Sequence, residues 1–251
     1  MNRADSPQLR HEVLREIFNR LKQEYGYQGW WPLVTQAGTR GRTASGYRRA
    51  PGAPGIPPPS ARLEIILGTI LTQNTAWENA RRAMGELHEK GLLEVSRILQ
   101  TPDSELASAV RSSGYYNQKA KKIKALVRYL SEKGFFASRS AGAPTRDELI
   151  AQWGVGPETA DSILLYAYQQ PTFVVDAYTH RLLIRMGIIE KPNYERTQSL
   201  FHEALERDAA TWGEYHALLV QHGKQRCRSR PVCDRCPLLD LCDFGRRALL
   251  P

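Results

Sequence analysis

Four cysteines near the end of the chain are the residues whose type and spacing point most directly to chemistry. They are the only cysteines among the 251 residues, and they follow the pattern C-x5-C-x2-C-x5-C at Cys227, Cys233, Cys236 and Cys242. Four thiolates so close in sequence can converge on one centre, either a 4Fe–4S cluster or a tetrahedral zinc ion. Zinc sites commonly pair two C-x2-4-C knuckles across a longer spacer, whereas here a single C-x2-C pair has one cysteine on each side. The spacing therefore favours the iron–sulfur cluster, with zinc as the alternative.

Arginines lie beside and between these cysteines, at Arg226, Arg228, Arg230 and Arg235. A loop that a metal centre holds rigid and that carries arginines is suited to binding phosphate groups, although an exposed basic loop without a ligand has the same composition. The whole chain carries 35 Lys+Arg against 26 Asp+Glu, a formal net charge of +9. This excess favours a polyanionic partner but does not by itself identify one.

Residues 149–163, LIAQWGVGPETADSI, contain a second pattern with a chemical use. A helix is expected to end near Gln152, Gly154 and Gly156 then make a tight turn, and Pro157 stands where the first residue of a helix belongs. Such a hairpin directs the backbone N–H groups of a helix N-terminus outward, where they bind a phosphate without reading bases, often through a bridging cation. An ordinary turn between two helices is the alternative.

Asp176 is the candidate catalytic carboxylate. It follows the apolar run Phe173-Val174-Val175, about twenty residues after the glycine hairpin. An aspartate in front of a helix is ordinarily an N-cap, so capping is the simplest interpretation. A capping aspartate that faces a pocket can also serve in catalysis.

Helices must position these residues, because apolar side chains recur with the helical period of about 3.6 residues along nearly the whole chain. The first such segment spans residues 8–22, and another begins at Arg62. Further helices are expected at residues 78–90, 93–99, 103–112, 119–133, 146–152, 157–169, 176–187, 194–207 and 211–224. There is no convincing series of alternating strands and no repeat of fixed period. The sequence therefore predicts an all-α fold.

One segment departs from the helical pattern. Between Gly38 and Pro59, ten of twenty-two residues are Gly or Pro, four are Arg and none is acidic. Such a segment buries too little apolar surface to offset the entropy lost on ordering. It is therefore expected to be a mobile basic linker that could touch a phosphate backbone.

The composition limits the class of protein. With 41% hydrophobic and 24% charged residues the chain is typical of globular proteins, and no apolar run approaches the roughly 20 residues that span a bilayer. The N-terminal stretch MNRADSPQLRHEVLREIF lacks the uninterrupted apolar core of a signal peptide. We therefore expect a cytoplasmic protein without disulfides or a membrane partner, associated with the nucleoid if the source is a bacterium.

Taken in order, these motifs resemble the endonuclease III branch of the helix-hairpin-helix (HhH-GPD) DNA glycosylases. The resemblance rests on G-V-G-x-x-T-A, on V-V-D and on the four-cysteine tail, and extends over roughly residues 62 to 245. Residues 70–75, ILTQNT, are similar to the helix end whose glutamine, here Gln73, fills the gap left by a flipped base. Residues 114–120, GYYNQKA, are similar to the loop that wedges into the opposite strand, here with Tyr115.

The family implies a two-domain, all-α protein: a six-helix barrel and a cluster domain built from both ends of the chain, with the active site in the cleft between them. The expected parts are an N-terminal helix and aromatic segment (1–37), the basic Gly/Pro-rich loop (38–60), the barrel (61–170, with the hairpin motif at about 146–169) and the C-terminal part of the cluster domain (171–251, with the cysteine loop at 227–242). The implied cofactors are the 4Fe–4S cluster and a monovalent cation at the hairpin. The implied partner is double-stranded DNA with a damaged base, bound by a monomer.

Glu158 is the departure from the family pattern that matters most for function. In bifunctional members a lysine at this position of the hairpin attacks the sugar C1′ and the strand is then cleaved. A carboxylate cannot form a Schiff base, so the resemblance implies a monofunctional glycosylase. The first cysteine spacer, five residues rather than six, and Trp153 in place of the proline common before the hairpin are smaller departures.

Within the family, W-W-P, ILTQNTAW, GYYNQKA and VVDAY are most similar to the enzymes that remove 3-methyladenine, which also lack the lysine. That base is cationic and already a good leaving group, and its recognition calls for aromatic stacking with a cation–π contribution. The aromatic candidates for the pocket are Trp30, Trp31 and Trp77, each of which could instead belong to the core. The other pocket candidates, for which packing or a bystander position is the alternative, are Tyr178, His180 and Glu158.

The implied mechanism gives each motif a role. Asp176, ionised, stabilises the oxocarbenium-like sugar as the base departs and positions or deprotonates the attacking water. Gln73 and Tyr115 hold the duplex open while the damaged nucleotide rotates out. The residues expected to contact DNA are Gln73, Tyr115, Gly154, Val155, Gly156, Thr159, Arg226, Arg228 and Arg230.

Two other functions remain open. One is an endonuclease III-like glycosylase for oxidised pyrimidines or mismatches, with weak or no lyase activity. The other is a non-catalytic DNA-binding protein that keeps the hairpin and the cluster. A redox-only iron–sulfur protein would explain the cysteines but neither the hairpin nor the basic charge balance.

Overall fold

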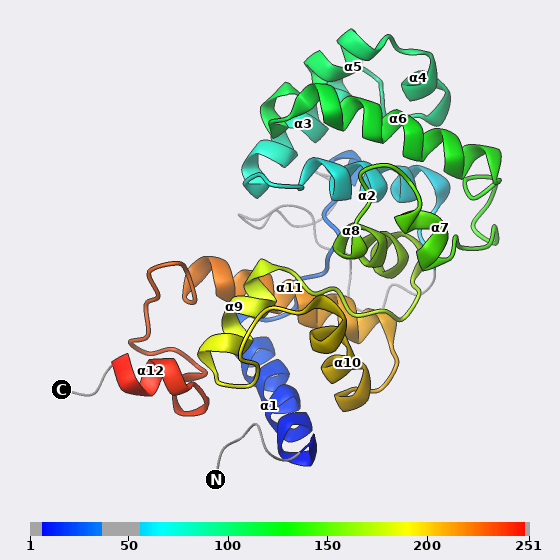
Figure 1. The fold of residues 1–251 in the computed structure, drawn as a ribbon. Coiled ribbons are helices and arrows are strands. Elements are labelled where there is room, and N and C mark those ends of the chain that lie inside the picture. Colours follow the sequence, from blue (N-terminus) through cyan, green and yellow to red (C-terminus); the bar gives the residue numbers. More distant parts are fainter. Residues whose placement is uncertain (1–6, 37–55, 249–251) are drawn as a thin grey trace. The chain divides into compact units, whose positions relative to one another are not determined.

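The computed structural model describes residues 7–36 and 56–248, and every regular element in that part of the chain is helical (Figure 1). The expected all-α fold is therefore confirmed. The chain divides into two compact units, Met1–Trp30 with Pro171–Pro251 and Trp31–Gln170. The first unit thus joins both ends of the chain, and its N-terminal part ends at Trp30 rather than at the expected residue 37. None of the described helices is both long enough and apolar enough to cross a membrane.

The first unit is built around helix α11. Its helices are α1 (Pro7–Tyr25), α9 (Ala177–Arg185), α10 (Tyr194–Ala204), α11 (Ala209–Gln225), a 3-10 turn (Leu239–Leu241) and α12 (Asp243–Ala248). α11 contacts α1 and α9, and α1 also packs on α10. The core is aromatic: the rings of Phe173 and Phe201 stack with centroids 3.7 Å apart, and Trp212 and Tyr215 meet Phe173 edge-on.

A buried carboxylate fixes the turn that leads to Trp30. Glu214 of α11 accepts hydrogen bonds from the backbone N–H groups of Gln28 (2.5 Å) and Gly29 (2.9 Å). Two charge-assisted hydrogen bonds to one carboxylate are strong constraints on a loop. The turn is therefore held on α11 from almost two hundred residues away in sequence.

The second unit is built around helix α2. Its elements are a 3-10 turn (Val34–Gln36), α2 (Pro59–Leu71), α3 (Trp77–Glu89), α4 (Val95–Gln100), α5 (Asp103–Ala109), a 3-10 turn (Arg111–Ser113), α6 (Tyr116–Glu132), α7 (Arg146–Ile150), α8 (Pro157–Ser162) and a π-helical turn (Ile163–Ala167). α2 is buried on all sides from Ala61 to Leu71, and it contacts α3, α6, α8 and the π-helical turn. Most of its buried side chains are apolar, and the buried Arg62 and Glu64 are hydrogen-bonded, so α2 is suited to the centre of a helical unit.

Several boundaries differ from the prediction. The helix expected at residues 157–169 becomes π-helical at Ile163, and the one expected at 103–112 divides into α5 and a 3-10 turn. α6 begins at Tyr116, three residues earlier than expected, and α12 was not predicted. Of the basic linker expected at residues 38–60, residues 38–55 lie outside the described part of the chain.

Candidate functional site

The glycine hairpin connects α7 to α8 in the second unit. A capping box starts α7, with Thr145 and Glu148 each bonding the other's backbone N–H. Gly154 has a φ of +80°, which favours glycine, and Pro157 opens α8. Because the guanidinium of Arg146 binds both oxygens of the buried Asp161 (2.9 and 3.2 Å), α7 and α8 are tied together across the turn.

Gln73 is brought onto this hairpin. It follows the end of α2, next to Asn74 in the left-handed region (φ 50°). Its amide nitrogen donates to the carbonyl of Gly154 (3.1 Å) and to Oγ1 of Thr159 (3.0 Å), while Nζ of Lys122 donates to its amide oxygen (2.8 Å). The structure therefore brings together three of the residues expected to contact DNA: Gln73, Gly154 and Thr159.

Tyr115 protrudes from the same unit. It precedes α6 with a left-handed φ of 46°, and 69% of its surface is exposed. A large aromatic residue is both strained and exposed in this position, and such features are commonly kept for function. Tyr115 thus has the exposure that a wedge into DNA requires.

Lys119, which was not among the residues predicted from the sequence, joins the Tyr115 loop to the end of α2. Its side chain is buried, and Nζ donates to the carbonyls of Leu71 (2.8 Å) and Ser113 (2.7 Å). Burial, with a smaller contribution from the charge of Lys122, lowers the pKa of Lys119 to about 8. The signal for it was a lysine on the apolar face of the predicted helix, beside Ala120 and Ile123.

Asp176 lies in the first unit as the N-cap of α9. One carboxylate oxygen accepts from the backbone N–H of Thr179 (2.8 Å) and from its hydroxyl (2.9 Å). The other lies 3.6 Å from Nε2 of His216, and the Asp176 side chain is 11% exposed. Burial alone would raise the pKa of Asp176, but the contacts with His216 and Thr179 outweigh it and lower the pKa below its usual value. The predicted catalytic carboxylate is thus held in its ionised form.

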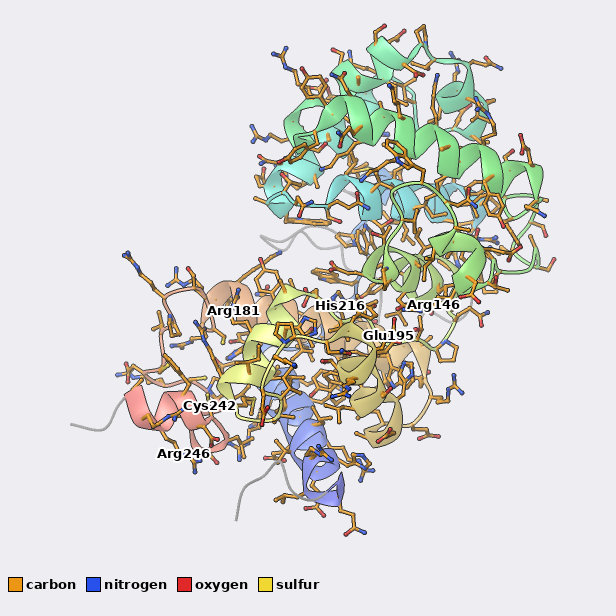
Figure 2. The ribbon with its side chains drawn as sticks, viewed as in Figure 1. Arg146, Arg181, Glu195, His216, Cys242 and Arg246 are labelled. Carbon is orange, nitrogen blue, oxygen red and sulfur yellow. The ribbon has the colours of Figure 1, made fainter. Side chains whose placement is uncertain are left out.

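His216 and Lys224, both on α11, surround Asp176 and were not predicted. Figure 2 labels His216, which meets the ring of Trp30 edge-on with centroids 5.8 Å apart. Nζ of Lys224 lies 5.8 Å from the centre of the same Trp30 ring. Burial lowers the pKa of Lys224, and the charge of Asp176 opposes that shift. The carboxylate therefore has an imidazole, an ammonium and an indole in its surroundings.

The remaining pocket candidates are placed as follows. Tyr178 packs on α11, where a side chain at Gly223 would come within 2.3 Å of its ring, and the guanidinium carbon of Arg181 lies over the same ring, 5.0 Å from its centre. Nε2 of His180 is buried and has no hydrogen-bond partner among the residues that the structure describes. The contacts of Tyr178 are those of a packing residue.

Trp31 and Trp77 lie in the second unit and pack on each other, with ring centroids 5.9 Å apart. Trp31 is 9% exposed and also contacts Tyr166 and Gly68, where any side chain would come within 2.8 Å of the indole nitrogen. Trp31 therefore serves the core of its unit. Glu158 is exposed in the first turn of α8, beside the hairpin.

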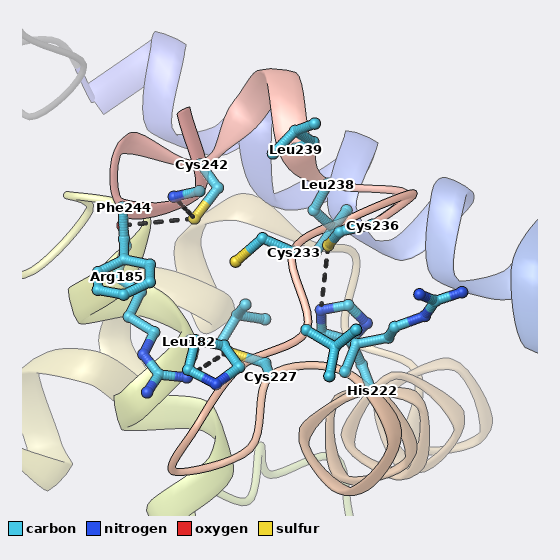
Figure 3. Close-up of a pocket in the computed structure, with 14 residues that line it drawn as sticks. Leu182, Arg185, His222, Cys227, Cys233, Cys236, Leu238, Leu239, Cys242 and Phe244 are labelled. Carbon is cyan, nitrogen blue, oxygen red and sulfur yellow. Dashed lines mark hydrogen bonds between the residues drawn. The ribbon is translucent and has the colours of Figure 1, made fainter. Parts of the chain in front are cut away.

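The four cysteines line one pocket of the first unit (Figure 3). Hydrogen-bond donors face their sulfur atoms: the backbone N–H of Gly245 lies 3.3 Å from Sγ of Cys242, and the guanidinium of Arg185 lies 3.2 Å from Sγ of Cys227. Burial raises the pKa of the Cys236 thiol to about 11 in the absence of a metal. Four thiols with N–H donors around them are the donor set of an iron–sulfur cluster, so these residues fit that group.

Two arginines of α9 hold the start of the cysteine loop, and neither was predicted. Arg185 donates to the carbonyls of Arg228 (2.6 Å) and Ser229 (3.0 Å), and Arg181, labelled in Figure 2, donates to the carbonyl of Cys227 (2.7 Å). The side chains of Arg228 and Arg230 are left exposed. Arg226 lines the cysteine pocket and donates to the carbonyl of Asp234 (2.9 Å).

Comparisons with known proteins agree with this geometry. The family model described as HhH-GPD superfamily base excision DNA repair protein matches residues 67–207. A Methanocaldococcus jannaschii protein with the name "Putative DNA repair glycosylase" is 37% identical over 239 residues, 92% of this chain and 96% of its own length. Endonuclease III of Thermotoga maritima is 30% identical over 188 residues, 73% of this chain and 83% of its own.

Solved structures show the same fold. A trapped endonuclease III–DNA covalent intermediate matches with a TM-score of 0.73 and 21% identity, over 96% of this chain and 99% of that one. The H. pylori 3-methyladenine DNA glycosylase bound to 1,N6-ethenoadenine matches with a TM-score of 0.64 and 27% identity, over 86% and 97%.

Proposed function

The chain belongs to the HhH-GPD superfamily of base excision DNA repair proteins and is a DNA N-glycosylase, and from that premise we propose that it is monofunctional. It hydrolyses the N-glycosidic bond of a flipped damaged base, with an alkylated purine such as 3-methyladenine as the preferred lesion. The observation that carries this proposal is the buried Asp176, kept ionised by Thr179 and His216, together with a carboxylate, Glu158, where a lyase needs an amine.

The described contacts support separate roles for DNA binding, duplex opening and catalysis. The hairpin and the exposed arginines of the cysteine loop bind phosphates, which positions the duplex without reading its sequence. Gln73 and Tyr115 hold the duplex open around the extruded nucleotide. Asp176 then faces the positive charge that develops on the sugar, where a fixed carboxylate in a dry environment stabilises the transition state. A water that this carboxylate orients attacks C1′ as the base leaves.

Two observations bear on the substrate in opposite directions. The H. pylori neighbour is a 3-methyladenine glycosylase, and the indole of Trp30 lies among the side chains around Asp176, as recognition of an alkylated purine requires. The ammonium of Lys224, however, lies over the same indole, where it would repel a cationic base. This second observation favours the alternative, an endonuclease III-like glycosylase for neutral oxidised or mismatched pyrimidines with little or no lyase activity.

An end-labelled duplex assay distinguishes these substrates. One duplex carries a stable 3-methyladenine analogue and the other thymine glycol, and each is incubated with the protein with and without hot alkali. Alkali-dependent breaks at the methylated base alone are expected. Breaks at thymine glycol that need alkali would replace the alkylated purine by an oxidised pyrimidine as substrate, and breaks without alkali would contradict the monofunctional assignment.

The pH dependence of the rate tests the state of Asp176. Its pKa lies below the usual value near 3.8, so the carboxylate stays ionised, and its contribution to both rate and stability is lost only as the pH falls through that lowered pKa. On a duplex with a neutral lesion, we expect the single-turnover rate to stay flat from about pH 8 to about pH 5. A loss of rate with a midpoint inside that range would show that the protonation state of a group other than Asp176 controls the rate.

We infer that the four cysteines hold a 4Fe–4S cluster. All four cysteines line one pocket, and N–H donors face two of their sulfur atoms. Their spacing favours a cluster over zinc, because zinc sites commonly pair two C-x2-4-C knuckles, whereas here a single C-x2-C pair has one cysteine on each side.

Iron removal is expected to affect DNA binding more than chemistry. The cluster would fix the loop that presents Arg228 and Arg230, and the Asp176 contacts do not involve that loop. Chelation should therefore weaken affinity for damaged duplex by at least about tenfold, as loss of several phosphate contacts does. Base release from bound DNA, measured in single turnovers, should slow by less than about threefold. An apo or zinc-loaded protein that binds DNA as tightly as the iron form would exclude this role.

A further inference from the structure

The side chain of Gln73 has all of its described hydrogen bonds inside the second unit. Its amide nitrogen is directed to the hairpin at Gly154 and Thr159, and its amide oxygen is directed to the ammonium of Lys122. A free glutamine side chain samples many rotamers, and ordering it costs entropy. Three hydrogen bonds, one of them to a charged group, remove that freedom before DNA arrives.

The side chain of Lys122 packs closely between Gln73 and the hairpin. Its aliphatic stem runs along the hairpin so closely that a Cβ on Gly154 would come within 2.4 to 2.8 Å of its side-chain carbons. The stem therefore packs where only a glycine leaves room, and the ammonium at its end reaches Oε1 of Gln73. A shorter or uncharged side chain on α6 would leave that oxygen without its donor.

Lys119 and Lys122 lie one turn apart on α6 and act on the same stretch of chain. Lys119 bonds the carbonyl of Leu71, two residues before Gln73, and the carbonyl of Ser113, two residues before Tyr115. Lys122 bonds Gln73 itself. Helix α6 thus connects the end of α2, the Tyr115 loop and the hairpin.

We propose that Lys122 is a positioning residue for Gln73: it holds the amide on the phosphate-binding hairpin, so that the gap-filling group and the hairpin meet DNA as one rigid piece. This rests on the proposed function, in which Gln73 fills the space left by the flipped base. Lys122 acts through Gln73 and does not take part in bond breaking. Its contribution is to the open state of the duplex and hence to base flipping.

The test compares Lys122→Met with Lys121→Met. Lys121 is the exposed neighbour on α6, so its variant loses the same charge without touching Gln73. Opening is followed by the fluorescence of 2-aminopurine placed beside a stable abasic analogue, at saturating protein. We expect K122M to lower the equilibrium constant for opening about ten- to a hundredfold relative to K121M, the range for loss of a hydrogen bond to a charged group. Both variants should bind undamaged duplex equally well and melt at the same temperature.

A double-mutant cycle tests whether the effect passes through Gln73. Because Lys122 is proposed to act only on that amide, K122M should add little to Gln73→Ala, whereas K121M and Q73A should act independently. Lys122→Arg, which keeps a cationic donor, should restore part of the opening. Additive effects of K122M and Q73A, or opening in K122M equal to or better than in K121M, would overturn the proposal.

Different results would contradict the role of Gln73 and the role of Lys122. If Q73A opens the duplex as well as the wild type, the gap-filling role of Gln73 is wrong and the inference falls with it. If Q73A is impaired while K122M matches K121M, the role of Gln73 stands and only the positioning by Lys122 is wrong.

Discussion

Replacing Asp176 by asparagine is expected to lower the single-turnover rate of base release by about three orders of magnitude, within the range of about 10²- to 10⁴-fold for loss of a catalytic acid or base. The carboxylate is the only group assigned to face the charge that develops on the sugar, and an amide carries no compensating charge. Affinity for a duplex with a damaged base should change by less than about twofold, because Asp176 is not among the phosphate-binding groups. Quenched-flow rates and equilibrium binding on the same duplex measure the two effects separately.

Asparagine is the informative replacement because it keeps the structural role of Asp176. Its side-chain oxygen can still accept from the N–H of Thr179, and asparagine caps helices about as well as aspartate. Asp208 offers a matched control: it caps α11 by accepting from the N–H of Thr211 (2.7 Å) and lies at an exposed position. Asp208→Asn should leave the rate unchanged. A D176N enzyme with wild-type rates would remove Asp176 from the mechanism.

His216 lies beside Asp176 and was not predicted from the sequence. It contacts the carboxylate oxygen that the cap leaves free, at 3.6 Å, and its ring meets Trp30. Nothing local marks it, since it lies forty residues after Asp176 within a helix whose residues from Trp212 to Val220 are all buried. Only the packing of α9 on α11 brings the two side chains together.

The parts that could be predicted are those whose physics is local. Helical periodicity located most of the helices, and Gly154 and Pro157 marked the turn because each has a backbone preference that the turn requires. Asp176 was recognised as an N-cap for the same reason. The predicted positions of helix ends were less accurate. Helix α6, for example, begins directly after the left-handed Tyr115, three residues before its predicted start.

The parts that could not be predicted are long-range polar contacts made by residues of ordinary appearance. Lys122 looks like a member of a solvated basic run, and the position of Lys119 on the apolar face of its helix does not say which groups it reaches. Lys119 is buried, and both lysines bond segments about fifty residues away. Arg185 likewise reads as a surface residue of α9 and instead holds the backbone of the cysteine loop. Buried charges of this kind are placed by tertiary structure, because only packing decides which carbonyls and carboxylates they can reach.

Replacing Glu158 by lysine is expected to add an activity, the formation of a covalent complex with an abasic sugar. Changing Glu158 to lysine places an amine in the first turn of α8, beside the hairpin. The positive end of a helix disfavours the ammonium form and so lowers the pKa of such an amine, which makes it a better nucleophile toward C1′ of an abasic sugar. With borohydride present, E158K should form a covalent complex with an abasic duplex at least about tenfold more than the wild type. Denaturing gels of labelled DNA measure the trapped fraction.

Glutamine at the same position is the control that distinguishes the effect of the added amine from the effect of losing the negative charge. Both E158K and Glu158→Gln remove a negative charge next to the expected phosphate site, so both should bind DNA more tightly than the wild type, and E158K should gain more because it also adds a positive charge. E158Q should trap nothing. Trapping by the wild type itself would contradict the monofunctional assignment, because it would require another amine at the abasic sugar. Lys224 would be the first to replace in that case, since burial lowers its pKa and it lies among the groups around Asp176. If neither wild type nor E158K traps DNA, then position 158 does not face the sugar and the inference from the missing lysine loses its basis.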